Sequence, residues 1–343
     1  MTTYRRLPAV LAALALVASG CSSGKKPAAQ PTPSPSSATP SPTPSPSPTK
    51  AQLLSPLTGR PVDRLRPVVA VKVDNAVLAR PQWGLEFADV VYEEAVEART
   101  TRFVAMYSSN AVPEVGPVRS VRESDVELLR MYGKVAFAFS GGNRGVLGGV
   151  RASGAVYEVS YNNTPSAYTI AGKRKDAYNF VTGYDRIVQR APQAAVAKDV
   201  GFRFGALPAG GNSGRQVSLT WSTFARTSWV YSPTKKLYMR YMDGRPAMLR
   251  NGKQQSAPTV IIQYCRVRNS RYSDVSGIAS PYTTTTGSGN VVVFRDGKRF
   301  AGTWKRSGLG PTRFLDKKGK DIKLKAGPVW IMLAPNDLTA KIS

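Results

Sequence analysis

The sequence predicts an α+β fold, with an N-terminal α/β domain containing a mixed sheet and a β-rich C-terminal domain. In residues 51–209, apolar runs typical of buried strands alternate with helical patterns. Residues 216–343 instead show alternating strand patterns separated by hairpin turns. Between them, the Gly-rich stretch 205–215 offers nothing that packs, so we place the domain boundary there.

The N-terminal domain is expected to contain four strands and two helices. β-Branched and aromatic residues predict strands at 68–73, 89–96, 102–107 and 135–139. Helical patterns occupy 120–132 and 184–190. Ser120 and Glu123 match an S-x-x-E capping box, which predicts that the first helix begins at Ser120.

The C-terminal domain is marked by its turns. Hairpin turns are predicted at Asp243-Gly244, Asn251-Gly252 and Asp296-Gly297. The alternating run 236–242 lies between such turns, and a last strand is predicted at 329–333. Cys265 ends another strand-like run, so we expect a buried thiol there.

The first residues carry an export pattern. Arg5 and Arg6 precede an apolar run at 7–17 that is too short to span a bilayer. It ends in Ala-Ser-Gly-Cys, which resembles a bacterial lipobox with Cys21 as the lipidated residue. Residues 1–21 are therefore predicted to be a signal peptide with a lipobox, and an ordinary secretory signal is the alternative.

Residues 22–50 are rich in Pro, Ser and Thr and contain no aromatic residue and no aliphatic residue larger than Ala. Such a segment cannot bury a core, so we expect a disordered tether. At about 3.1 Å per residue in polyproline II, it would reach up to about 90 Å. We therefore expect a lipid-anchored, extracytoplasmic protein on the outer face of the cytoplasmic membrane.

Composition excludes several chemistries. The 343 residues include no histidine, so Ser-His-Asp and Cys-His catalysis and histidine metal ligands are excluded. The two cysteines are too few for a structural zinc site or a disulfide framework. We expect no metal and no cofactor.

The chain has 48 Lys and Arg against 21 Asp and Glu, a formal charge of +27. This charge favours polyanionic partners, and the export signal argues against nucleic acid. The expected partners are the membrane, through the lipid on Cys21, and an anionic wall polymer, peptidoglycan or anionic lipid head group. An envelope protein partner is a further possibility, and a merely solvated basic face is the alternative.

Two arginines flank the predicted helix start at Ser120. Arg119 and Arg122 would oppose the helix dipole, so a bound anion would compensate them. We predict an anion site formed by Arg119, Arg122, Arg102 and Ser120. Pairing of these arginines with nearby carboxylates is the alternative.

Three carboxylates are weak catalytic candidates, namely Asp74, Glu93 and Glu97. Period-two geometry places Glu93 and Glu97 on one strand face and Glu94 on the other. Asp74 ends the first strand, where open α/β sheets place ligand groups. A structural ion-pair network would give the same sequence pattern. The Gly-rich loop 140–145 is a weaker candidate for bringing backbone N–H groups near a ligand.

These segments resemble the DUF3048, or YerB-like, family of bacterial lipoproteins. The resemblance rests on SPLTG at 55–59, DN at 74–75, ADVVYE at 88–93, TRF at 101–103, GPVRSVR at 116–122, GTW at 302–304 and GPVWI at 327–331. The resemblance implies a membrane-anchored lipoprotein with a two-part architecture. It implies no particular activity, substrate or cofactor. Relatives often have histidine where this chain has Ala76, Phe139 and Tyr178.

Together these observations favour a non-catalytic envelope lipoprotein that binds an anionic wall component or an envelope partner. One alternative is a hydrolase or transferase acting on a phosphate-bearing or glycan wall substrate, with Glu93 or Glu97 as general acid or base. The other is a structural scaffold whose charged cluster only stabilises the fold.

Overall fold

The computed structural model describes residues 52–171, 178–274 and 276–343. The predicted signal peptide, Cys21 and the tether at 22–50 lie outside these residues. Ala51–Ser343 form one compact unit. None of the helices among the described residues has the length and hydropathy of a membrane-spanning segment.

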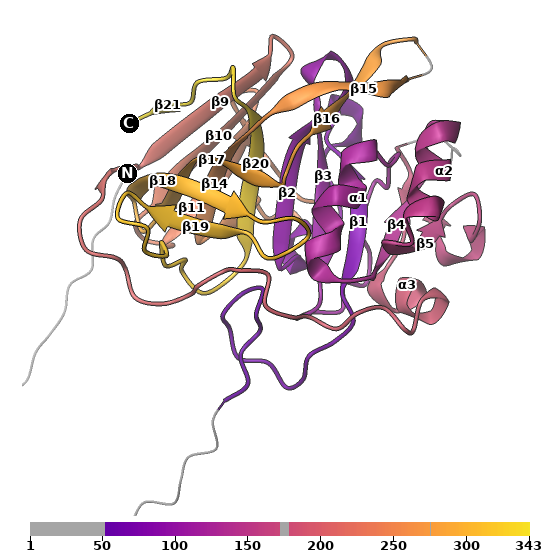
Figure 1. The fold of residues 1–343 in the computed structure, drawn as a ribbon, viewed down its shortest axis with the longest axis horizontal. Helices are drawn as coiled ribbons and strands as arrows, with labels where there is room; N and C mark the ends of the chain where they lie inside the picture. Colours follow the sequence, from indigo (N-terminus) through magenta and orange to yellow (C-terminus); the bar gives the residue numbers. More distant parts are fainter. Residues whose placement is uncertain (1–51, 172–177, 275) are drawn as a thin grey trace, which may run out of the picture. The chain divides into compact units, whose positions relative to one another are not determined.

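An 11-stranded mixed sheet forms the centre of this unit, in the order β19-β18-β17-β14-β20-β2-β3-β1-β4-β5, with β8 paired to β18 (Figure 1). Its N-terminal strands are β1 (Val69–Asp74), β2 (Val90–Ala95), β3 (Thr101–Tyr107), β4 (Val135–Phe139) and β5 (Val156–Ser160). Its later strands are β8 (Asn212–Ser213), β14 (Thr259–Cys265), β17 (Gly287–Arg295), β18 (Lys298–Arg306), β19 (Arg313–Asp316) and β20 (Val329–Pro335). Strands from both sides of the predicted boundary at 205–215 thus share one sheet.

The strand directions give this sheet one distinctive edge. β20 lies between β2 and β14 and is parallel to both. β3 is antiparallel to β2 and to β1, and β1 is parallel to β4, which is parallel to β5. The carboxyl ends of β1, β2, β4, β5, β14 and β20 therefore meet at one side, which we name the carboxyl edge.

A six-stranded antiparallel sheet covers one face of the large sheet. It contains β9 (Gln216–Ser222), β10 (Ala225–Ser232), β11 (Leu237–Met242), β12 (Arg245–Pro246), β13 (Ser256–Ala257) and β21 (Lys341–Ile342). Trp330 of β20 packs edge-on against Trp229 of β10, with ring centroids 5.1 Å apart. Asp243 and Gly244, like Asp296 and Gly297, have positive φ in the predicted hairpin turns. Cys265 is buried, as predicted.

Helices α1 (Glu123–Leu129) and α2 (Arg144–Ser153) pack on the opposite face, whereas α3 (Tyr184–Arg190) contributes to the core shared with the six-stranded sheet. Two short hairpins pair β15 (Val267–Ser273) with β16 (Ala279–Thr283) and β6 (Thr169–Ile170) with β7 (Phe180–Val181). Single 3₁₀ turns are η1 (Val77–Ala79), η2 (Leu85–Phe87), η3 (Glu97–Arg99), η4 (Arg130–Tyr132) and η5 (Pro165–Ala167).

The predicted fold class is confirmed, with one correction to a helix. The helix predicted from Ser120 begins at Glu123, and η4 continues it to Tyr132. The amide of Val121 donates to the carbonyl of Gly141, which holds this segment extended against the loop after β4. The cap comes from Asp125, whose carboxylate accepts the Arg122 amide at 2.7 Å, and not from Ser120.

A buried ion pair joins the two sheets. Glu93 of β2 and Arg240 of β11 lie 2.8 Å apart, and both side chains are fully buried. The Arg240 guanidinium also stacks on the rings of Phe103 and Trp330. The hydroxyl of Thr227 donates to the same Glu93 oxygen at 2.8 Å. This cluster fixes the six-stranded sheet against β2.

We predict that Arg240→Met destabilises the protein by about 3–5 kcal/mol, because it leaves the buried Glu93 charge without its ion-pair partner. Adding Glu93→Gln should restore at least half of the loss, since it removes that charge. Urea denaturation of residues 51–343 measures both free energies of unfolding.

The matched control is Arg99→Ala, which breaks an exposed ion pair with Asp337. Like the pair of Glu93 with Arg240, this pair joins the N-terminal part of the chain to the C-terminal part. It should cost less than about 1 kcal/mol. Equal losses for Arg240→Met and Arg99→Ala would contradict the assigned role of the buried pair.

Candidate anion-binding site

A cavity of about 570 Å³ opens at the carboxyl edge, and four arginines line it, namely Arg102, Arg119, Arg122 and Arg144. Arg102 lies at the start of β3, and Arg144 is the first residue of α2. Arg119 and Arg122 come from the extended segment before α1. We name this hollow the arginine cavity. All four residues predicted from the sequence to bind an anion, Ser120 included, line it.

Two of these arginines are held by carboxylates. Arg119 Nε lies 2.9 Å from Asp74 Oδ2, and Arg122 pairs with Glu97. Asp74 also accepts the backbone N–H groups of Asn75 and Ala76, at 2.8 and 3.1 Å. The carboxylate pairing considered as an alternative is thus present. This pairing orients Arg119 and Arg122, and both arginines still line the cavity.

Arg102 shows that the positive charge is only partly compensated. Burial, together with the positive charge of Arg122, lowers its pKa to about 10, and Arg119 adds to the effect. Its Nε lies 3.9 Å from Asp74 Oδ1, too far for a hydrogen bond. The Nε atoms of Arg102 and Arg122 are both buried without a hydrogen-bond partner. An anion in the cavity would stabilise this arrangement.

The first turn of α2 forms another wall. Gly142, Asn143 and Arg144 line the cavity, and Asn143 caps the helix by accepting the Gly145 amide at 2.8 Å. A Cβ on Gly142 would lie 2.9 Å from Val121, so the loop needs glycine to pack this closely. The Gly-rich loop singled out in the sequence therefore borders the cavity, although its role in ligand binding stays a prediction.

The hairpin β15–β16, from the C-terminal part of the chain, lies beside α1 and β2 (Figure 1). Its residues Ser273, Asp274 and Ser280 form one wall of the cavity. Ser280 donates to Glu97, and Asn143 Nδ2 donates to the carbonyl of Ser273 at 2.9 Å. Ser270 donates to Glu123 at 2.6 Å. Sequence reasoning missed this wall because the hairpin carries no local motif that links it to residues 97–144.

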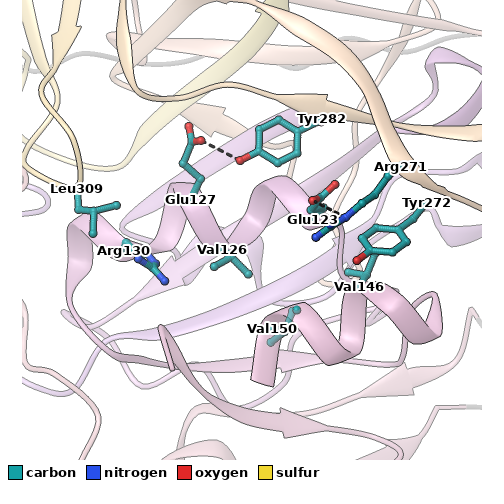
Figure 2. A pocket seen from close by; sticks show the side chains of 11 residues that line it. Glu123, Val126, Glu127, Arg130, Val146, Val150, Arg271, Tyr272, Tyr282 and Leu309 are labelled. Carbon is teal, nitrogen blue, oxygen red and sulfur yellow. Dashed lines mark hydrogen bonds and ion pairs between the residues drawn. The ribbon is translucent and has the colours of Figure 1, made fainter. Parts of the chain in front are cut away.

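A smaller hollow of about 350 Å³ adjoins the arginine cavity at Val146. Figure 2 shows valines of α1 and α2 at its base and tyrosines of the hairpin at its rim. Glu127 accepts a hydrogen bond from Tyr282 at 2.8 Å, and Glu123 lies 3.7 Å from Arg271. These α1 carboxylates therefore hold the hairpin in place.

The three catalytic candidates do not converge. Glu93 is buried and pairs with Arg240 of the six-stranded sheet, whereas Asp74 is buried and pairs with Arg119. The prediction that Glu93 and Glu97 share a face is wrong, because β2 ends at Ala95 and η3 turns Glu97 towards Arg122. Burial opposes ionisation of Glu97, but Arg122 and Ser280 outweigh it and hold its pKa at about 2.

A buried triad lies beneath the cavity. Lys72 Nζ pairs with Glu94 and lies 2.7 Å from Asp125 Oδ1. One lysine cannot neutralise two buried carboxylates, so burial and the charge of Asp125 raise the pKa of Glu94 to about 7. Lys72 was missed by sequence reasoning, although a lysine inside the apolar run 68–73 is itself a signal.

We predict that the triad makes the protein less stable as the pH rises. The pKa of Glu94 is raised above its unfolded value of about 4.3, so the folded protein keeps a proton that the unfolded chain releases between about pH 4.3 and 7. Glu94→Gln should flatten this fall in the free energy of unfolding, by on the order of 2 kcal/mol between pH 5 and 7.5.

Denaturation curves at several pH values test this. Burial raises the pKa of Asp89 to about 6. Asp89 therefore also makes the free energy of unfolding fall as the pH rises, in Glu94→Gln as well as in the unchanged protein. Parallel pH profiles for Glu94→Gln and the unchanged protein would show that Glu94 does not carry the buried proton.

No group of three or more Cys, Asp and Glu side chains is placed to hold a metal ion in the described part of the chain.

Comparison with known proteins identifies the family. Residues 57–197 match the model "Protein of unknown function (DUF3048) N-terminal domain", and residues 217–331 match its C-terminal counterpart. "Putative lipoprotein YerB" of Bacillus subtilis (strain 168) is 29% identical over 309 residues, which cover 86% of this chain and 90% of that protein. The crystal structure of YerB from Bacillus subtilis matches with a TM-score of 0.73 and 25% identity, over 84% of this chain and all of that one. The chain belongs to the DUF3048 family.

Proposed function

We propose that this protein is an envelope lipoprotein that binds an anionic wall component in the arginine cavity, without catalysing a reaction. The observation that carries the proposal is the convergence of four arginines on one cavity. Glu97 and Asp274 are the carboxylates among its lining residues. Arginine forks favour phosphate and carboxylate groups, which they bind through two parallel hydrogen bonds.

The proposed cellular location rests on residues 1–50 and on the family. The lipobox-like sequence ending at Cys21 and the Pro-rich tether suit a lipid-anchored protein on the outer face of the cytoplasmic membrane. The similarity to "Putative lipoprotein YerB" supports the same address. There the candidate ligands are wall polymers, peptidoglycan carboxylates and anionic lipid head groups.

Binding is favoured over hydrolysis or transfer by the state of the carboxylates. A general acid or base works best with a pKa near the operating pH. Glu97, which lines the cavity, has its pKa held at about 2 by Arg122 and Ser280 against the effect of burial. Glu93 is enclosed in the core and cannot reach a ligand. Both groups suit structural pairing better than proton transfer.

Arg144→Ala tests the proposal without disturbing the fold. Arg144 is exposed and makes no ion pair with any described residue, so its removal leaves no buried carboxylate unpaired. We expect a three- to tenfold loss of affinity for a phosphate-bearing wall polymer, measured by calorimetric titration at physiological salt.

The double variant Arg119→Ala with Arg122→Ala should abolish saturable binding. Arg186→Ala on α3 is the charge-matched control and should keep the affinity within twofold. If Arg144→Ala and Arg186→Ala weaken binding equally, and salt removes the binding in both, the basic surface acts only as a diffuse field. If the unchanged protein turns over a wall substrate and the double variant does so more slowly, the protein is an enzyme and the proposal of binding without catalysis is wrong.

A further inference from the structure

We propose that a neutral oligosaccharide binds in a second cleft, which opens on the large sheet over β14, β17 and β18. This cleft, which we name the neutral cleft, has a volume of about 730 Å³. Ligand sites usually have volumes of about 300–1,000 Å³. The neutral cleft shares no lining residue with the arginine cavity, so the sugar would be a second ligand beyond the anion of the proposed function.

The floor of the neutral cleft is a part of the large sheet that the six-stranded sheet leaves uncovered. Ile262 of β14 and Phe294 of β17 are fully buried in the core shared with the six-stranded sheet. Strand side chains alternate between faces with a period of two, so Tyr264 and Asn290 lie on this same face. There Tyr264 is half-buried and Asn290 is exposed. The face that packs on the second sheet therefore continues into an open surface.

This open surface carries both polar and apolar side chains. Asn290 is directly opposite Thr303 of β18, and Tyr264 lies on the neighbouring strand β14. The next opposite pair on the same face is Val292 with Ala301, of which Val292 is half-buried and Ala301 is exposed. Sugar rings have the same two kinds of surface, because hydroxyl groups project from the rim and C–H groups form the faces. The floor thus matches the chemistry of a sugar ring.

The segment after β20 forms a wall beside this floor. Asn336, Leu338 and Thr339 line the cleft before the chain continues to β21. The Asn336 amide donates to the carbonyl of Cys265, and the Leu338 amide donates to the carbonyl of Pro335, both at 3.0 Å. These bonds fix the wall to the ends of β14 and β20. A wall that is already in place lowers the entropic cost of binding.

The polar side chains of the neutral cleft are free to bind a ligand. Within residues 52–171, 178–274 and 276–343, no hydrogen bond or ion pair engages the side chains of Tyr264, Asn290, Thr303, Asn336 and Thr339. Hydroxyl groups and amides both donate and accept hydrogen bonds. Sugar hydroxyls also do both, so this set of side chains can pair with them in either direction.

The charge of the neutral cleft argues against an anionic ligand there. Lys317 is the single charged residue among those that line it, in a chain with a formal charge of +27. The arginine cavity, by contrast, is lined by four arginines. An aromatic ring with a few neutral polar groups is typical of a site that recognises its ligand by stacking and hydrogen bonds. The ring of Tyr264 provides the stacking surface.

The opposite face of the sheet supports Tyr264. Trp304 is buried in the core on that face, and its Nε1 donates to the carbonyl of Tyr264 at 2.8 Å. The string GTW at 302–304, on which the family resemblance partly rests, therefore contributes to the site on both faces. Gly302 and Thr303 line the cleft, and Trp304 holds the strand that carries the ring.

The test titrates residues 51–343 with tetramers of β-1,4-linked glucose and of β-1,4-linked N-acetylglucosamine, which are uncharged and extended. We expect saturable binding of at least one tetramer, with a Kd below about 1 mM. The Kd should stay within about twofold between physiological and high salt, because no ion pair holds the ligand. In amide NMR spectra, the largest shift changes should fall at 289–292, 301–303 and 336–339.

Three variants locate the site. Tyr264→Ala should weaken binding about tenfold because it removes the stacking ring, whereas Tyr264→Phe keeps the ring and should stay within about threefold. Ala301→Gln places a larger neutral side chain on the exposed floor and should weaken binding about fivefold while the protein stays folded. The matched control is Tyr157→Ala, which removes a half-buried tyrosine from β5 at the other end of the sheet.

The proposed sugar site is refuted if neither tetramer binds saturably, or if high salt removes the binding. It is also refuted if Tyr157→Ala weakens binding as much as Tyr264→Ala, or if the shift changes fall in the arginine cavity. These outcomes leave the proposed function standing, because its tests use an anionic polymer and variants of the arginine cavity. Conversely, loss of anion binding to the arginine cavity would leave the sugar site unaffected.

Discussion

The parallel pairing of β20 with β2 is the constraint on which the rest of the structure depends. Strands at opposite ends of the folded chain lie side by side through it, from Val90 opposite Val329 to Glu94 opposite Leu333. Because β20 also pairs in parallel with β14, three carboxyl ends align with those of β1, β4 and β5. The two family domains therefore build one sheet edge together, and the arginine cavity takes its walls from both.

Buried charges divide between the two faces of β2. Glu93 faces the six-stranded sheet and pairs with Arg240, whereas Glu94 faces α1 and pairs with Lys72. Neither charge is available to a ligand, and both are costly unless their partners stay in place. They specify how the sheet, α1 and the second sheet fit together. The first acidic residue after β2, Glu97, lines the arginine cavity instead.

The arginine cavity combines rigid positioning with incomplete neutralisation. Asp74 and Glu97 orient Arg119 and Arg122, so a ligand would not have to pay the full entropic cost of ordering two long side chains. Arg102 lines the same cavity, and burial and the positive charge of Arg122 lower its pKa. A preorganised excess of positive charge of this kind favours recognition of an anion over acid–base chemistry.

Sequence patterns predicted much of this arrangement because they are local. The apolar runs located β1 to β4 to within one residue at each end, and α3 lies at the predicted 184–190. The sequence GPVRSVR pointed to Arg119 and Arg122, two of the four arginines that line the cavity, whereas Arg144 was not predicted. Ser120 failed as a cap because a tertiary hydrogen bond of Val121 outweighs the local motif. The pairing of β2 with β20 and the contact of Ser280 with Glu97 join residues far apart in the chain, and no local pattern encodes them.

The most direct test of the central claim is hydrogen–deuterium exchange of residues 51–343 with and without a phosphate-bearing wall polymer. If the carboxyl edge binds the anion, exchange should slow at 97–102, 119–122 and 142–146 together, while α3 stays unchanged. Slowing spread evenly over the basic surface, or confined to segments away from this edge, would contradict the account.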